Sequence, residues 1–247
     1  MLESIKQIKC MKYTFKSAER IDNKILNATF ETKINIQPLQ LYIQKKESGQ
    51  EILYSEGFHN NEVLINPNGF PYFNLSFSPF SSLMRKDAHH TIFETGFNYL
   101  GTIIDENLKK SNDLYTYITL NGETIFDGKT CYKLIMNYPE FNYYSYKMEK
   151  EQTLTSFAKK MSLNEFMIAE KNEMDAGSKL KKDTKILIPN LYAKKIIILV
   201  DKSSYLPISI SIYDEKGLFE EYGFYNLKIN PEMMKNDFSE DNEEYGF

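Results

Sequence analysis

Two adjacent histidines, His89 and His90, are the residues of this sequence best suited to chemistry. Arg85, Asp87 and Glu94 flank them, so the cluster offers groups that could exchange protons or bind a metal ion. Adjacent side chains in a strand point to opposite faces, however, and no further histidine stands at a spacing typical of metal ligands. We therefore expect a polar strand or loop with one inward, hydrogen-bonded histidine.

The sequence patterns of the common catalytic sites are missing. It contains no G-x-S-x-G, H-E-x-x-H, phosphate-binding loop or G-x-G-x-x-G pattern. We expect a protein that is not an enzyme, with no catalytic residue, no metal ion and no cofactor.

A cluster of aromatic residues is the second candidate site. They fall among prolines and serines, in a segment too irregular to be one strand: Phe70, Tyr72, Phe73, Phe77 and Phe80. They either line or gate a cavity for an apolar ligand, or fill the concave side of a curved sheet as plain core. Both interpretations remain open from the sequence.

Composition describes a globular chain with a sizeable core. Of its 247 residues, 42% are hydrophobic and 14% aromatic, with many β-prone Tyr and Phe. A net charge of −4 with interspersed signs argues against a nucleic-acid-binding surface, and no apolar run is long enough to span a bilayer.

Cys10 and Cys131 are either two separate thiols or a disulfide formed in an oxidising compartment. The acidic segment 237–244 predicts a solvated end.

Alternating apolar residues predict that antiparallel strands position these groups. A meander is expected over 13–20, 25–36, 39–43, 51–54 and 63–65, and three further strands over 194–201, 207–213 and 218–229. Between them we expect a helix within 95–110 and a hairpin of strands 114–120 and 131–136 that turns at Asn121-Gly122. The fold class is α+β: a curved antiparallel sheet, or open β-barrel, covered by helices.

Residues 146–189 read as a compact α-containing module inserted between host segments 1–145 and 190–247. A short strand from Tyr146 precedes one helix over 154–161, with a cap at Gln152-Thr153, and a second over 165–172. A strand ending at Pro189 closes the order strand, helix, helix, strand. We expect the insert to leave and rejoin neighbouring strands, and the host to stay folded without it.

This segment resembles a LysM module, a small βααβ fold that binds N-acetylglucosamine-containing glycans of peptidoglycan and chitin. The resemblance is carried by Tyr146-x-Met148, Thr153-Leu154, Phe157-Ala158, Asn172 and Ile186-x-Ile188-Pro189. It implies a small core that includes Leu154 and Ile186. The implied glycan-binding residues are Lys150, Glu151, Gln152, Thr153, Asp175 and Asp183. Because acidic residues stand where the family often has glycine, the implied glycan contact is weak.

The strand order of the host resembles the LolA and LolB lipoprotein-carrier superfamily and related secreted families, in which an open barrel wraps an apolar cavity. The phrases that carry this resemblance are Gly49 to Gly57 and Val200-Asp201-Lys202-x-x-Tyr205-Leu206-Pro207. It implies a periplasmic or cell-envelope protein. No signal peptide is visible, so we interpret the start as lying where a secretion signal was removed.

Two functions follow from these resemblances. The first is a non-catalytic envelope protein that binds a lipid or an acylated protein in the barrel and peptidoglycan weakly through the insert. The second is a structural or protein-interaction module with a filled barrel. A connected internal pocket of several hundred Å³ would favour the first.

Overall fold

A single antiparallel sheet of 11 strands forms the body of the protein, in the order β6-β5-β4-β3-β2-β1-β15-β14-β13-β8-β7. The structure is a computed structural model that describes residues 1–81, 84, 88–97, 101 and 116–247. The sheet strands are β1 (Cys10–Ile21), β2 (Lys24–Asn35), β3 (Gln40–Lys45), β4 (Glu51–Ser55), β5 (Val63–Asn66), β6 (Leu75–Phe77), β7 (Ile118–Phe126), β8 (Lys129–Asn137), β13 (Lys195–Asp201), β14 (Pro207–Asp214) and β15 (Gly217–Ile229). The expected α+β class and curved antiparallel sheet are confirmed.

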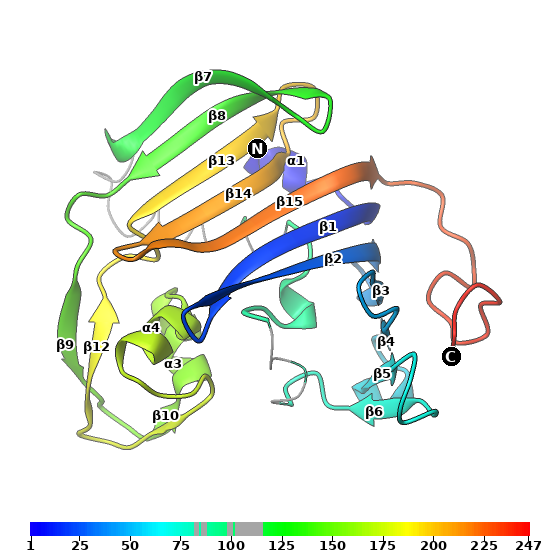
Figure 1. Ribbon diagram of the computed structural model, residues 1–247, viewed down its shortest axis with the longest axis horizontal. Coiled ribbons are helices and arrows are strands. Elements are labelled where there is room, and N and C mark those ends of the chain that lie inside the picture. The colour runs from blue at the N-terminus through cyan, green and yellow to red at the C-terminus, as the bar shows by residue number, and fades with distance from the viewer. Residues whose placement is uncertain (82–83, 85–87, 98–100, 102–115) are drawn as a thin grey trace.

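The sheet is strongly arched, and the described residues of the connection between β6 and β7 lie on its concave side (Figure 1). The described part of that connection carries the 3₁₀ helix η3 (Ile92–Glu94). Described residues outside the insert also form the short helix α1 (Leu2–Lys6) and the 3₁₀ helix η1 (His59–Asn61). Most of the helix expected within 95–110 lies outside the described residues. Within the described ranges, no helix is long and apolar enough to cross a bilayer.

Residues with positive φ close the β1–β2 and β7–β8 hairpins. Asp22 and Asn23 take φ of 50° and 61°, and so close the two-residue turn between β1 and β2. The turn expected at Asn121-Gly122 is wrong, because β7 continues through these residues to Phe126. They fall where the β7–β8 register shifts, so they form a bulge, and the hairpin turns at Asp127-Gly128 instead.

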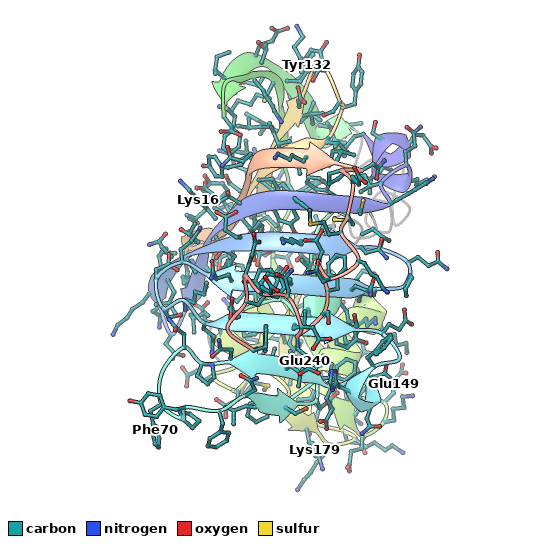
Figure 2. The ribbon with its side chains drawn as sticks, turned by 90° about the vertical axis from the view of Figure 1, so that its right-hand side faces the viewer. Lys16, Phe70, Tyr132, Glu149, Lys179 and Glu240 are labelled. Carbon is teal, nitrogen blue, oxygen red and sulfur yellow. The ribbon has the colours of Figure 1, made fainter. Side chains whose placement is uncertain are left out.

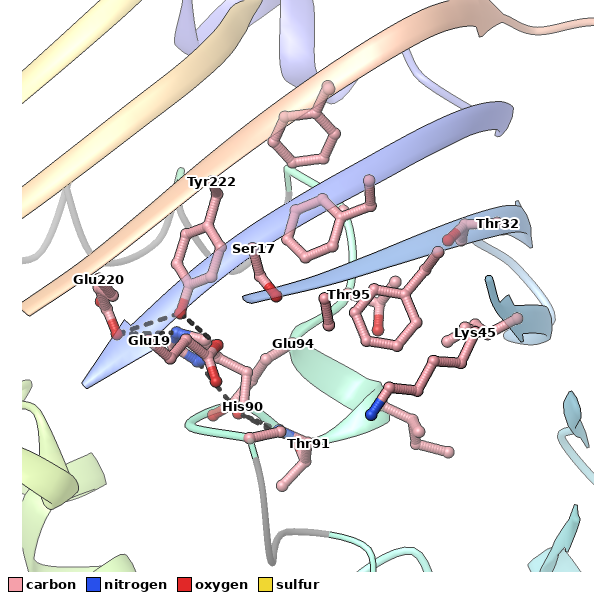
Figure 3. Close-up of a pocket in the computed structure, with 18 of the residues that line it drawn as sticks. Ser17, Glu19, Thr32, Lys45, His90, Thr91, Glu94, Thr95, Glu220 and Tyr222 are labelled. Atoms are coloured by element: carbon pink, nitrogen blue, oxygen red, sulfur yellow. Dashed lines mark hydrogen bonds and ion pairs between the residues drawn. The ribbon is translucent and has the colours of Figure 1, made fainter. Parts of the chain in front are cut away.

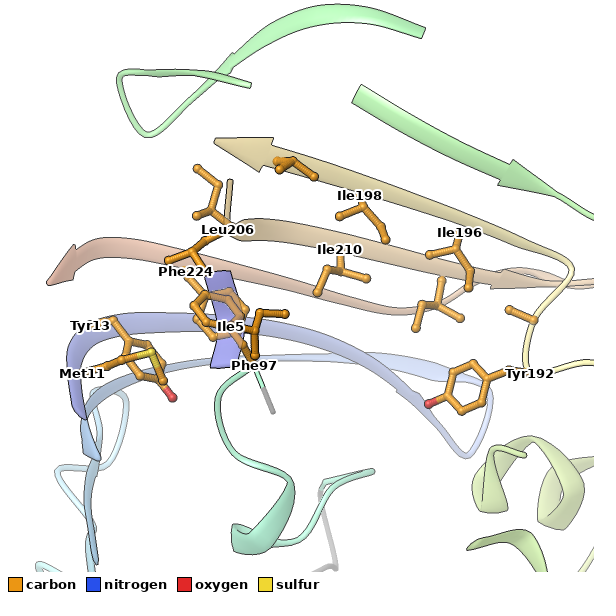
Figure 4. Close-up of a cluster of buried hydrophobic side chains, with 14 of the residues drawn as sticks. Ile5, Met11, Tyr13, Phe97, Tyr192, Ile196, Ile198, Leu206, Ile210 and Phe224 are labelled. Carbon is orange, nitrogen blue, oxygen red and sulfur yellow. The ribbon is translucent and has the colours of Figure 1, made fainter. Parts of the chain in front are cut away.

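The packed part of the core lies under the β13–β14–β15 side of the sheet. Ile198, Ile210 and Phe224 meet Ile5 of α1 and Phe97 there, and all five are buried (Figure 4). Phe97 approaches Phe224 with ring centroids 4.3 Å apart. Burial of such side chains is the main stabilising contribution in a sheet of this size. The concave side is therefore partly filled.

The insert has the expected order of elements. Its outer strands β9 (Tyr143–Lys147) and β12 (Lys185–Pro189) pair with each other, and helices α3 (Leu154–Met161) and α4 (Glu165–Lys171) lie between them in sequence. A short pair, β10 (Gln152–Thr153) and β11 (Lys179–Leu180), precedes α3 and follows α4. The insert begins and ends next to β8 and β13, which are neighbouring strands as expected.

Local sequence explains the helices of the insert. Thr153 caps α3 by accepting a hydrogen bond from the Ser156 amide, and Asn164 caps α4 in the same way. Leu154 and Ile186 are both buried in a small core of the insert itself, as expected. That core also contains Met148, Phe157, Ala158, Leu163, Ile168, Ala169, Leu180 and Ile188.

Helix α4 also packs against the sheet. Met167 belongs to the main core and Phe166 packs on it. The Glu170 carboxylate accepts from Arg20 at 3.3 Å, and Lys171 pairs with Glu215 at 2.8 Å. The insert therefore shares a buried interface with its host as well as having its own core.

The two cysteines are separate, buried thiols. Cys10 lies on β1 and Cys131 on β8, with β15, β14 and β13 between them in the sheet. Four strand spacings of about 4.8 Å exceed the Cα separation that a disulfide spans, roughly 7 Å at most. The sheet order thus excludes a bond between them.

The C-terminal segment is not the solvated end that its acidic composition predicts. Asp237 is buried and pairs with Lys12 at 2.8 Å and Lys33 at 2.7 Å. Tyr245 stacks on Tyr42 with ring centroids 3.7 Å apart. Figure 2 shows this segment, marked by Glu240, crossing the outer face of the sheet. The burial of Asp237 could not be predicted from its acidic neighbours, because the two lysines that pair with it are more than 200 positions away along the chain.

Candidate functional site

A cavity of about 700 Å³ lies between the concave face of the sheet and the connection around η3 (Figure 3). Strands β1, β2, β3, β4, β14 and β15 contribute to its walls, and described residues between 84 and 96 cover it. The concave side is therefore hollow here, beside the packed part of the core.

Aromatic side chains form one wall of the cavity. Phe15 lies at its centre, with ring centroids 5.2 Å from Phe224, 5.4 Å from Tyr222, 6.3 Å from Phe30 and 6.3 Å from Tyr13. Aliphatic residues extend the apolar lining: Ile25, Leu26, Ile43, Ile52, Ile210 and Ile212. We call the five rings the aromatic wall. It offers a continuous apolar surface to a ligand.

A cluster of charged and polar groups forms one end of the cavity, centred on the fully buried Glu220. Its Oε2 atom lies 2.8 Å from His89 Nδ1 and 3.6 Å from His90 Nε2. The Tyr222 hydroxyl donates to Glu19 Oε1 at 2.7 Å, and lies 3.1 Å from Glu220. These hydrogen bonds and charges compensate the cost of burying the carboxylates.

The period of two in a strand explains how the wall and the polar cluster come to share one face. Along β1, Tyr13, Phe15, Ser17 and Glu19 alternate into the cavity, and Glu220, Tyr222 and Phe224 do so along β15. Neither Glu19 nor Glu220 was predicted from the sequence to belong to a site. One signal in the sequence could have identified them. In both β1 and β15 a glutamate occupies the same alternating positions as the aromatic residues, and the two strands are neighbours in the sheet.

Both histidines face the same carboxylate, contrary to expectation. Adjacent side chains point to opposite faces in a strand, but residues 89–90 form a bend instead. His89 also has its Nε2 atom 3.0 Å from the Arg20 carbonyl oxygen, and its ring stacks on Phe166 and Phe219. Of the three flanking residues, 85 and 87 lie outside the described part of the chain, and Glu94 has its Oε2 atom 3.5 Å from His90 Nδ1.

Charge neutralisation shifts the pKa values of this cluster. Burial alone would lower the pKa of His90, but hydrogen bonds and charges of Glu220 and Glu94 raise it to about 10. Burial would raise the pKa of each carboxylate, but the two histidines lower that of Glu220 well below its usual range, and His90 lowers that of Glu94. His90 is therefore a cation held between two anions.

Stability should consequently fall as pH rises from 6.5 to 10. An unfolded histidine loses its proton near pH 6.5, whereas folded His90 keeps it up to about pH 10. The folded state binds more protons in this window, so raising the pH favours unfolding. We expect urea unfolding to show a loss of about 2 kcal/mol between pH 6 and pH 9. The depressed carboxylates act oppositely and contribute stability above about pH 4.5.

A matched pair of variants checks this assignment. His90→Asn should flatten the slope above pH 6.5. His59→Asn should leave it unchanged, because the His59 side chain is 43% exposed and lies 3.5 Å from the exposed Glu240. An unchanged slope in His90→Asn would contradict the assignment.

The five aromatic residues singled out in the sequence do not line this cavity. Phe70, Tyr72, Phe73 and Phe80 are 86%, 88%, 66% and 72% exposed, around the short edge strand β6. Phe77, on β6, packs partly buried against the main core. Figure 2 shows Phe70 on the outside of the molecule. The rings of the aromatic wall are other residues, on β1, β2 and β15.

The six residues implied by the LysM resemblance lie on the surface of the insert, in or next to β10, β11 and β12. Lys150, Glu151, Asp175 and Asp183 are exposed, while Gln152 and Thr153 are half-buried. Asp183 has a φ of 66°, the left-handed conformation that favours glycine, and pairs with Lys147 at 2.8 Å. Glycan binding stays a prediction.

Several solved structures are similar to this chain at low identity. LprF from Mycobacterium bovis has a TM-score of 0.48 and 10% identity, with 95% of this chain and 92% of that chain covered. The Mycobacterium tuberculosis lipoprotein LppX has a TM-score of 0.45 and 10% identity, covering 94% and 92%. A LolA superfamily protein from Nitrosomonas europaea has a TM-score of 0.33 and 11% identity, covering 97% and 96%.

No curated protein matches the sequence. One family does, in two overlapping parts that together span nearly the whole chain: residues 8–163 and 147–247. The overlap, 147–163, falls within the insert. The chain therefore belongs to the family described as proteins of unknown function, DUF1571.

Proposed function

We propose that this protein binds, without catalysis, a ligand with an apolar chain, such as a lipid or the acyl group of a lipoprotein. The cavity of about 700 Å³ carries the proposal. Its volume lies within the range of small-molecule sites, about 300–1,000 Å³. It is also the feature that separates this function from that of an interaction module with a filled barrel.

The lining favours an apolar chain over a polar metabolite. The aromatic wall and the aliphatic residues beside it offer little to a ligand with many hydroxyl groups. Each methylene of an acyl chain buried there would contribute about 0.8 kcal/mol. The carboxylates Glu19 and Glu220 are already engaged by protein groups, so their role is to stabilise one end of the cavity.

Filling the cavity should abolish binding. Ser17 lines the cavity beside the aromatic wall, so Ser17→Phe would occupy the space that a chain needs. Organic extraction of the purified protein followed by mass spectrometry should recover apolar compounds from the wild type. We expect about tenfold less from Ser17→Phe, a loss of about 1.4 kcal/mol in binding.

The control is Ala18→Phe, one position along β1 and absent from the cavity lining. It adds the same ring on the other face of the strand, so it should retain the extracted compounds. Recovery of nothing from the wild type, together with no binding of added dodecanol, would contradict the proposed function. Equal recovery from both variants would place the ligand elsewhere.

We further propose that the insert contacts peptidoglycan weakly, in a cell-envelope location. The resemblance of 146–189 to LysM modules and its strand-helix-helix-strand order support this. Replacing both Glu151 and Asp183 with glycine should strengthen retention on purified peptidoglycan. Absence of retention for either protein would favour a role of the insert in protein contacts.

A further inference from the structure

One lysine reaches into the cavity and has no charged or hydrogen-bonding side-chain partner among the described residues. Of the described residues that line the cavity, Lys45 is the sole lysine or arginine. It lies at the end of β3, directly opposite Phe30 of the aromatic wall in the β2–β3 pairing. Figure 3 shows its side chain pointing into the cavity. Its ammonium group makes no ion pair or side-chain hydrogen bond within the described part of the chain. Lys45 is nevertheless half-buried, and burial of a charged group without a partner costs free energy.

The cavity carboxylates do not supply the missing partner. Glu19 accepts from Tyr222 and from the His89 amide, and Glu94 accepts from the Thr91 amide at 2.7 Å. Glu220 faces both histidines. The acidic cluster is thus neutralised by its own neighbours, while Lys45 stands apart from it on another strand.

We propose that the ligand is an anionic amphiphile whose acidic head group, a carboxylate or a phosphate, binds the Lys45 ammonium. This inference rests on the proposed function, because it assigns the polar end of the same ligand. Its chain would lie along the aromatic wall, starting from Phe30 next to Lys45 and continuing to Phe15. An ammonium group in a partly apolar cavity favours an anion, because the pair is weakly screened there.

The neighbouring lysine provides a matched control. Lys46 directly follows β3, whose last residue is Lys45. It is absent from the cavity lining, and its ammonium group lies 3.3 Å from Glu31 Oε1. Lys45→Met removes the charge inside the cavity and keeps a long unbranched side chain. Lys46→Met removes an equal charge outside it, so a general change of net charge affects both variants alike.

The experiment is isothermal titration calorimetry, in which delipidated protein is titrated with four amphiphiles of the same chain length. Dodecanoate and dodecyl phosphate carry the two anionic head groups, dodecanol is neutral, and dodecyltrimethylammonium is cationic. All are used below their micelle concentrations and at low salt, which keeps screening small. Wild type should bind an anionic probe about tenfold more tightly than dodecanol, and the cationic probe most weakly.

The variants test whether Lys45 causes the preference for an anionic head group. Lys45→Met should bind the anionic probe and dodecanol with equal affinity. Lys45→Arg and Lys46→Met should still bind the anionic probe more tightly than dodecanol. Which of dodecanoate and dodecyl phosphate binds more tightly distinguishes a fatty-acid head from a phosphate head. An anionic preference that survives in Lys45→Met, or equal binding of dodecanol and both anions by wild type, would overturn the inference while leaving the proposed function intact. Failure of all four probes would overturn both.

Discussion

Replacing Glu220 with alanine should destabilise the protein by about 3–5 kcal/mol, because it removes the anion that faces the buried His89 and the half-buried His90. Glu220 is 0% exposed and its Oε2 atom lies 2.8 Å from His89 Nδ1. His89 also has its Nε2 atom 3.0 Å from the Arg20 carbonyl oxygen, so both its ring nitrogens have oxygen partners. Without Glu220, His89 Nδ1 would lose its partner, and the His90 cation would lose one of its two anions.

Glu220 also holds the insert in place. Asn164, the N-cap residue of α4, has its Nδ2 atom 3.5 Å from Glu220 Oε2 and 3.4 Å from the Tyr192 hydroxyl. Loss of the carboxylate therefore weakens the polar end of the cavity and the docking of α4 together. Urea unfolding followed by circular dichroism measures the free energy of unfolding.

Glu221 supplies the control for this experiment. It is the next residue of β15, points to the other face and is exposed, with a hydrogen bond from Ser211 at 2.7 Å. Glu221→Ala should change the free energy of unfolding by no more than about 0.5 kcal/mol. A Glu220→Ala protein within about 1 kcal/mol of wild type would show that the cluster contributes little to stability.

Deleting residues 146–190 and joining the ends by a short Gly-Ser linker should destroy the cooperative folding of the sheet. The sequence alone favoured the opposite result, because the insert leaves and rejoins neighbouring strands, and closing a short loop costs little. The structure changes this expectation. Deletion would strip Met167 and Phe166 from the main core and leave buried Arg20 without Glu170.

A point variant measures the same interface without removing a segment. Met167→Ala should cost about 2–4 kcal/mol, since the side chain is 1% exposed and joins α4 to the main core. Leu187→Ala, at a 40% exposed position of the same insert, should cost far less. For the deletion, near-ultraviolet circular dichroism and dye binding report the loss of packing. A deletion protein with wild-type unfolding would establish the insert as an independent domain.

Local interactions explain what the sequence by itself determined. The β1–β2 turn depends on Asp22 and Asn23, which tolerate positive φ, and α3 begins where Thr153 caps it. The alternation of apolar residues predicted nearly all strands of the sheet, and the strand-helix-helix-strand order of the insert followed from spacing within 44 residues. Each of these turns, caps and strands depends on residues that lie within a few positions of it in the sequence.

Only the tertiary structure decided which residues share a site. Glu19 and Glu220 are 201 positions apart, yet the β1–β15 pairing brings them to one cavity wall, where His89 and His90 meet them from a bend. The curvature of the sheet determined which aromatic residues line the cavity. It placed Phe15 and Phe30 inside the cavity and the exposed Phe70 at the edge, although all three are equally apolar. Composition cannot distinguish these positions, because burial depends on which distant strands pair and how far the sheet bends.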